Sequence, residues 1–180
     1  MKGVLFYLGR CSDRAGEALR SYKAVHGSAG SVKKSGRLLI KKNVSLEVRE
    51  DGSLVTGKGT VTLQSGCRIV VEKGGSLMIG DDVGINSNCY IAVHNRITIG
   101  SNTIFGPGVT LVDQDHDYKA EGGLKAEKYK VGSVTIGNNV WIGAGAVILR
   151  DTIIGDNAVI GAGSVVRGEV PAGTVFVNGR

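Results

Sequence analysis

The sequence predicts an all-β solenoid of parallel strands, and three observations lead to this fold class. Aliphatic residues recur at every sixth position in the C-terminal half, whereas helices repeat near 3.6 residues and strands near two. The position four residues after each aliphatic one is small or β-branched. Glycine is abundant, at 29 of 180 residues, and with asparagine it supplies the corner conformations of such a fold. The aliphatic positions are Ile136, Ile142, Ile148, Ile154, Ile160 and Val166, and the small ones are Val140, Ala146, Thr152, Ala158 and Ser164.

A triangular coil explains this repeat. Three short strands joined by tight corners make one turn of about eighteen residues. Each strand places its aliphatic side chain inside the prism, and the small residue fits where the interior narrows. Every strand then pairs with the coils above and below, so each coil contacts mainly its neighbours.

The same frame occurs earlier in the chain but with two interruptions. Ile99 lies two residues out of phase with Ile91, which predicts a slip within 92–98. The segment 113–133 has no hexad and is expected to project as a loop, and long ordered loops are usually functional. The earlier aliphatic positions are Ile79, Ile85 and Ile91, then Ile99, Phe105 and Leu111.

The N-terminal third is less regular, although we expect one domain over residues 1–180. Residues 36–78 predict degenerate coils with wider corners, and 79–177 predict hexapeptide coils. Residues 1–35 form an irregular capping segment, in which Ser12 to Val25 favours a short helix. Such a cap is needed because an open solenoid end exposes core and strand edge.

Composition narrows the class of protein further. The net charge of +6 fits either a solvated surface or an anionic partner, but no dense basic stripe with aromatics indicates nucleic acid. The scattered cysteines Cys11, Cys67 and Cys89 favour neither a disulfide framework nor a zinc site. The apolar run Met1 to Leu8 is too short to span a membrane, so we expect a cytoplasmic protein without integral membrane contact.

The hexads resemble those of the hexapeptide-repeat acyltransferases, through "NNVWIGAGAVIL" and "IGDNAVIGAGSVV". The tract "ITIGSNTIFGPGVTLVDQDHDY" is similar to the branch of maltose and galactoside O-acetyltransferases and of capsule and lipopolysaccharide O-acetyltransferases. This resemblance implies a left-handed parallel β-helix, an exception to the right-handed crossover rule. It also implies transfer of an acetyl group from acetyl-CoA to a hydroxyl of a sugar or surface-polysaccharide precursor, with no metal.

A sugar hydroxyl is a weak nucleophile, so the implied reaction needs a general base, and histidine suits this role near neutral pH. His116 matches the family's catalytic histidine, whereas His26 is expected at the surface. Asp113 and Asp115 are both candidates to orient His116. Asn88 is the better match for an asparagine that contacts the acceptor or the tetrahedral intermediate.

The resemblance also indicates where coenzyme A binds. The family's oxyanion donor is the backbone N–H that follows "WIG", which here belongs to Ala144. Ala162 lies eighteen residues on, one coil further along the same face. The cofactor-binding residues predicted here are Trp141, Gly143, Ala144, Gly145, Ala162, Arg167 and Arg180.

The acceptor side is less clearly encoded. The predicted acceptor-binding residues are Asn86, Asn88, His94 and Trp141. His94 lies at the expected slip, and Trp141 occupies an outward hexad position, where it packs a subunit or walls the acceptor. Four lysines of the loop either attract an anionic acceptor or are simply solvated: Lys119, Lys125, Lys128 and Lys130.

The frame also bears on assembly. Counting in hexads places His116 at the end of its coil and Ala144 in the second strand of the next one, so the two face apart within one prism. A closed threefold ring would bring His116 of one subunit towards the Ala144 face of another, which predicts a homotrimer.

Two alternative functions remain open on the sequence. A γ-carbonic-anhydrase-like zinc lyase shares the fold and needs three histidine ligands per metal. His94 and His116 are present, but the close histidine pair of that family is not. A non-catalytic β-helix scaffold is the other alternative.

Overall fold

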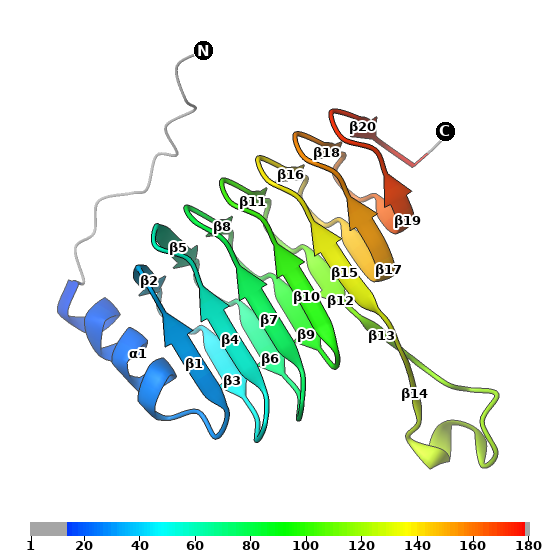
Figure 1. Cartoon of the computed structure of the whole chain (residues 1–180), viewed down its shortest axis with the longest axis horizontal. Helices are drawn as coiled ribbons and strands as arrows, with labels where there is room; N and C mark the ends of the chain where they lie inside the picture. Colours follow the sequence, from blue (N-terminus) through cyan, green and yellow to red (C-terminus); the bar gives the residue numbers. More distant parts are fainter. Residues whose placement is uncertain (1–13, 179–180) are drawn as a thin grey trace.

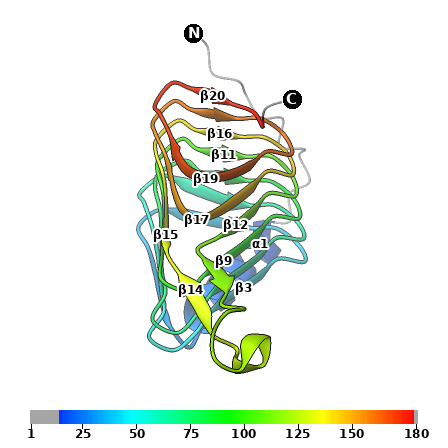
Figure 2. The same ribbon diagram turned by 90° about the vertical axis from the view of Figure 1, so that its right-hand side faces the viewer.

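The computed structural model describes residues 14–178, which form a left-handed parallel β-helix with one helix and one projecting arm (Figure 1). The predicted fold class is therefore confirmed. Viewed from the C-terminal end, the coils lie over one another and the arm leaves the stack at one corner (Figure 2). Cys11 and Arg180 lie outside the described residues.

Parallel strands build three faces of a prism, because each strand pairs with its counterparts in the neighbouring coils. The first face contains β1 (Ser31–Lys34), β4 (Ser53–Thr56), β7 (Ser76–Ile79), β10 (Arg96–Ile99), β15 (Ser133–Ile136) and the end of β17 (Val147–Ile154). The second contains β2 (Arg37–Ile40), β5 (Thr60–Leu63), β8 (Gly84–Ile85), β11 (Ile104–Phe105), β16 (Trp141–Ile142), β18 (Val159–Ile160) and β20 (Val175–Phe176). The third contains β3 (Ser45–Val48), β6 (Arg68–Val71), β9 (Tyr90–Val93), β12 (Thr110–Val112), the start of β17, and β19 (Val165–Val170).

The core is one continuous aliphatic column inside the prism. All six predicted aliphatic positions from Ile136 to Val166 are at most 1% exposed, and the small positions between them are at most 2% exposed. These side chains stack in register, as the pairing of Ile142 with Ile160 shows. The six-residue repeat is therefore the spacing between successive inward-pointing side chains.

Asparagine and glycine occupy corners with positive φ, as predicted. Asn139 and Asn157 have φ values of 54° and 60° in successive coils, and the Asn139 side-chain amide donates to Asn157 Oδ1 at 2.8 Å. A short side chain in this conformation can hydrogen-bond locally, which offsets the strain that most residues would feel there.

The coils are not all of one length. In the regular part Trp141 pairs with Val159 in the next coil, whereas the early coils are wider, as Ser53 paired with Ser76 shows. The predicted slip between β9 and β10 is present, at the corner His94–Asn95. A shortened corner inside β19 was not predicted from the sequence: between Val166 and Val170 the aliphatic step falls from six residues to four.

The predicted helix is α1 (Arg14–His26), one residue longer at its end than expected, and Ser12 lies outside the described residues. It packs against β1 and β2 of the first coil. The Ser21 hydroxyl and the Arg20 Nε donate to the backbone carbonyls of Leu38 and Ile40, the latter at 2.6 Å, so α1 caps the coil through polar contacts. None of the helices within residues 14–178 has the length and apolarity needed to cross a membrane.

The segment 113–133 projects as expected but is more ordered than a loop. Strands β13 (Gln114–His116) and β14 (Tyr129–Val131) form an antiparallel ladder, and the short 3₁₀ helix η1 (Gly123–Ala126) lies at its tip (Figure 1). We call residues 113–132 the arm. The arm leaves the prism at the corner between the third and the first face.

Candidate active site

The base of the arm is built on the slip in the coil frame. Asp113 is fully buried, and its two carboxylate oxygens accept the backbone N–H groups of His94 at 2.7 Å and Asn95 at 2.8 Å. The Asn95 side chain donates in turn to the carbonyl of Gly132 at 2.9 Å. Asp113 therefore stabilises this corner, and no described hydrogen bond joins it to His116.

His116 lies at the end of β13, exposed, opposite Tyr129 of β14. The Tyr129 ring lies 4.6 Å from the His116 ring and 4.9 Å from the His94 ring, centroid to centroid. The Nδ1 atom of His94 is buried and has no hydrogen-bond partner within the described residues. The arm thus gathers both predicted histidines around one tyrosine, which the sequence analysis did not single out.

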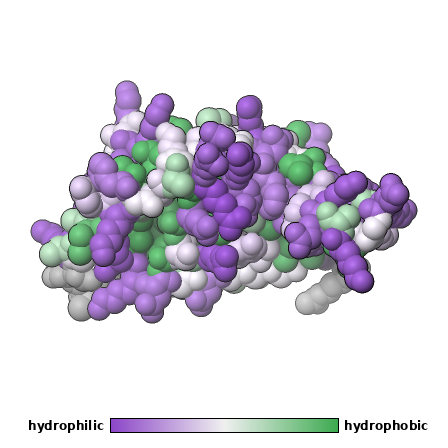
Figure 3. All heavy atoms as spheres, turned by 90° about the horizontal axis from the view of Figure 1, so that it is seen from below, coloured by the Kyte–Doolittle hydropathy of each residue, from purple (hydrophilic) through white to green (hydrophobic). Residues whose placement is uncertain are grey.

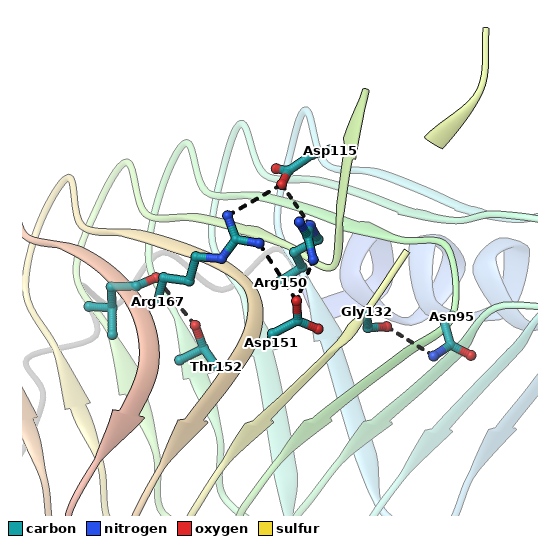
Figure 4. Close-up of polar contacts among 8 residues, drawn as sticks. Asn95, Asp115, Gly132, Arg150, Asp151, Thr152 and Arg167 are labelled. Atoms are coloured by element: carbon teal, nitrogen blue, oxygen red, sulfur yellow. Dashed lines mark hydrogen bonds and ion pairs between the residues drawn. The ribbon is translucent and has the colours of Figure 1, made fainter. Parts of the chain in front are cut away.

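A network of four charges joins the arm to the last coils (Figure 4). Arg150 Nε donates to Asp115 Oδ2 at 2.6 Å, and the other end of its guanidinium pairs with Asp151. Arg167 lies 3.6 Å from Asp115 and 3.7 Å from Asp151. The hydrogen bond from Arg150 to Asp115 raises the pKa of Arg150 above its ordinary value. Asp115 is thus bonded to arginines, whereas no described hydrogen bond joins it to His116.

Sequence reasoning missed Arg150. The only signal for it was the hexad "ILRDTI", which replaces the usual second-position glycine and places two charges at a corner. Arg167, predicted as a cofactor residue, belongs to this network on the arm side of the prism. It is therefore not beside Ala144 and Ala162 of the same chain.

Ala144 lies at another corner, between the second and third faces. The expectation that it lies within the second strand is wrong, because β16 ends at Ile142. Pro107, Ala144 and Ala162 occupy equivalent positions there, as shown by the 2.9 Å bond from the Gly145 N–H to Pro107 and the 2.8 Å bond from the Gly163 N–H to Ala144. We call this edge the Ala144 corner.

The backbone N–H of Ala144 donates to no protein acceptor within residues 14–178, and Ala144 is exposed. Glycine in the preceding coil keeps this amide accessible. A Cβ atom on Gly106 would come within 2.6 Å of the Ala144 nitrogen, and one on Gly143 would come within 2.5 Å of the Ala162 nitrogen. The Ala144 corner therefore offers amide donors along a surface with only small side chains, which suits an extended ligand with a carbonyl group.

The remaining predicted residues divide between the two corners. Asn88 is an exposed corner residue with a φ of 60°, on the same edge as Ala144, and Asn86 is half-buried beside it. Trp141 projects from the second face between Ile104 and Val159 and is 54% exposed. His94, by contrast, lies with the arm. Among residues 14–178, no three His, Cys, Asp or Glu side chains cluster closely enough to hold a metal ion.

Comparison with known proteins defines the class. Residues 133–168 match the family model described as bacterial transferase hexapeptide (six repeats). The putative lipopolysaccharide biosynthesis O-acetyl transferase WbbJ of Escherichia coli K12 is 32% identical over 136 residues, which cover 71% of this chain and 69% of that protein. The chain belongs to the hexapeptide-repeat acetyltransferases.

Two further similarities support less: the first covers a shorter part of the chain, and the second has a lower sequence identity. The galactoside O-acetyltransferase of E. coli K12 is 41% identical over 102 residues, and the match spans 57% of this chain but only 50% of that protein. A crystal structure of a mutant of AntD, an N-acyltransferase from Bacillus cereus, superposes with a TM-score of 0.62 at 20% identity, covering 84% of this chain and 79% of AntD. At this identity the structural match shows the fold alone.

Proposed function

We propose that this protein transfers an acetyl group from acetyl-CoA to a hydroxyl of a sugar or of a surface-polysaccharide precursor. The observation that carries the proposal is the pair of corners: one presents the unpartnered amide of Ala144, and the other presents His116 on a clamped arm. Relatives named for lipopolysaccharide and galactoside O-acetylation support this choice of acceptor class.

The chemistry needs only these two features. His116 removes the proton of the acceptor hydroxyl as its oxygen attacks the thioester carbonyl and forms the new C–O bond. The Ala144 N–H donates to the oxyanion that develops on the carbonyl oxygen. The C–S bond then breaks, and His116 returns the proton to the departing thiolate, which leaves as free coenzyme A. Trp141, Asn86, Asn88 and His94 are assigned to the acceptor.

The separation of the two corners supports assembly as a homotrimer. Within one chain, the third face lies between the Ala144 corner and the corner from which the arm projects. A threefold ring would place the arm of one subunit against the Ala144 corner of its neighbour, so that three sites form between subunits. We expect this assembly in the cytoplasm, where acetyl-CoA is available.

The lysines of the arm bear on the acceptor's charge. Lys119, Lys125 and Lys128 are exposed and make no ion pair within the described residues, whereas Lys130 lies 3.4 Å from Asp117. Three cations without an ion pair on the arm that carries His116 favour an acidic sugar or a nucleotide-linked sugar. AntD, which has the same fold, was crystallised with dTDP and coenzyme A.

The test is an acceptor screen with acetyl-CoA, in which release of the free thiol is measured over neutral sugars, uronic acids and sugar nucleotides. His116→Ala is expected to lower kcat at least about 100-fold on the best acceptor, because general-base catalysis is lost. His26→Ala, which changes an exposed histidine on α1, is the matched control and should keep full activity. Full activity of His116→Ala would contradict the mechanism, and stoichiometric zinc in the purified protein would favour the lyase.

A further inference from the structure

Helix α1 contacts the first coil largely through polar side chains and leaves its two largest apolar side chains exposed. Glu17, Arg20 and Ser21 form hydrogen bonds or ion pairs with the first coil, and the small side chain of Ala24 packs against the core. Leu19 and Tyr22 are 54% and 61% exposed, and Tyr22 lies at the groove between α1 and the first coil. Buried apolar groups normally drive helix packing. The exposed side chains of Leu19 and Tyr22 therefore make α1 a candidate docking surface.

Positive charge is concentrated at this end of the molecule. Residues 14–42 contain eight Lys and Arg against one Asp or Glu, whereas residues 43–178 contain 11 against 14. Within the described residues, six of these cations are exposed and have no carboxylate partner, namely Arg14, Lys23, Lys33, Lys34, Arg37 and Lys42. The net charge of the whole protein thus arises from α1 and the first coil, which we call the basic cap.

The basic cap is also concave. A groove of about 730 Å³ lies between α1 and β2, and Arg14, Lys34 and Arg37 line it together with Tyr22. At the left-hand, N-terminal end of Figure 3, apolar and hydrophilic surface adjoin one another. Cations beside exposed apolar side chains on one helix are typical of segments that lie in a membrane interface.

We propose that the basic cap binds the surface of a membrane rich in anionic phospholipids. Each lysine or arginine near such a surface is attracted by its negative potential, and Leu19 and Tyr22 can enter the boundary between headgroups and acyl chains. A nucleic acid would instead be matched by a basic stripe with several stacking aromatics, and among the described residues Tyr22 and His26 are the only rings that line the groove. The inference does not depend on the proposed reaction, because binding is measured without acetyl transfer.

The experiment measures sedimentation of the full-length protein with sucrose-loaded vesicles. Phosphatidylcholine vesicles are compared with vesicles that contain about 30 mol % phosphatidylglycerol, at about 0.1 M and about 0.5 M salt. We expect binding to the anionic vesicles at low salt, at least about 10-fold weaker binding at high salt, and little binding to pure phosphatidylcholine.

Two variants with the same net charge identify the surface. Lys33→Glu/Lys34→Glu/Arg37→Glu changes the basic cap and should weaken vesicle binding at least about 10-fold. The matched control reverses three exposed cations outside the basic cap, Arg68→Glu/Lys73→Glu/Arg96→Glu, and should change binding less than about twofold.

A third variant tests how much the exposed apolar side chains contribute to vesicle binding. Leu19→Ser/Tyr22→Ser keeps every charge and should weaken binding about 10-fold, because two exposed apolar side chains are lost from the interface. Absence of sedimentation with anionic vesicles at low salt would overturn the proposal. Equal losses in the basic-cap variant and its charge-matched control, or tighter binding to RNA than to anionic vesicles, would overturn it as well.

Discussion

Ala144 and Pro107 occupy the same position in successive coils. A proline at position 144 would therefore remove the proposed oxyanion donor, the backbone N–H, and change little else. Proline lacks the backbone N–H and otherwise fits a corner that already accepts it one coil earlier. Glycine precedes both residues, so the residue before proline is matched too.

Ala144→Pro is therefore expected to lower kcat about 100- to 1,000-fold, as loss of one oxyanion donor does elsewhere, with little loss of stability. Steady-state kinetics and thermal unfolding measure the two effects. Unchanged kcat in a folded Ala144→Pro protein would show that this amide takes no part in the reaction.

Asp113 shows how a candidate catalytic residue can have a structural role instead. It is buried, and both of its oxygens accept backbone N–H groups at the His94–Asn95 corner. Asp113→Ala should lower the free energy of unfolding by about 2–4 kcal/mol, because two backbone N–H groups lose the buried carboxylate that accepts them. Urea unfolding measures this, and Asp113→Asn, which keeps one oxygen, should lie between. A fall in kcat without a loss of stability would instead assign Asp113 to catalysis.

At the scale of elements, the arm is positioned by the clamp between Asp115 and Arg150. Asp115 directly precedes His116 in β13, while Arg150 belongs to β17 of the solenoid. Arg150 bridges two carboxylates, because it also pairs with Asp151. The planar guanidinium of arginine is well suited to this arrangement.

Arg150→Ala should lower kcat about 10- to 100-fold through misplacement of His116, while KM for acetyl-CoA stays nearly constant. Amide hydrogen exchange in β13 and β14 should become faster, which a direct chemical role would not cause. Arg150→Lys should restore part of the activity, and Arg68→Ala, an exposed arginine on the third face, serves as the control. If Arg150→Ala loosens the arm but keeps a normal kcat, the order of the arm is not needed for catalysis and the prediction is wrong.

At the scale of the whole molecule, the question is whether one chain or two build each site. A mixed trimer of His116→Ala and Ala144→Pro chains distinguishes the cases. If His116 and the Ala144 corner come from different subunits, some interfaces join an intact arm to an intact corner, and activity recovers on mixing. If both come from one chain, the activity of a mixture does not exceed the summed activities of the two variants measured separately. Light scattering should give the mass of a trimer in the same preparations.

The sequence determined the features that repeat locally. Six-residue periodicity fixed which side chains enter the core, and residues such as Asn139 and Gly145 marked the corners, because each choice depends only on a residue's own position in its coil. The slip at His94–Asn95 and the departure of the arm were predicted for the same reason, since both interrupt that period.

Only the tertiary structure decided what meets across the interruptions. Asp115 and Arg150 are separated by the arm and part of a coil, so no periodicity relates them, and Tyr129 lies in a segment without a frame. The exposure of Leu19 and Tyr22 likewise depends on which face of α1 the first coil covers. Contacts between segments that do not share a repeat follow from packing in three dimensions, whereas the coils themselves follow from spacing along the chain.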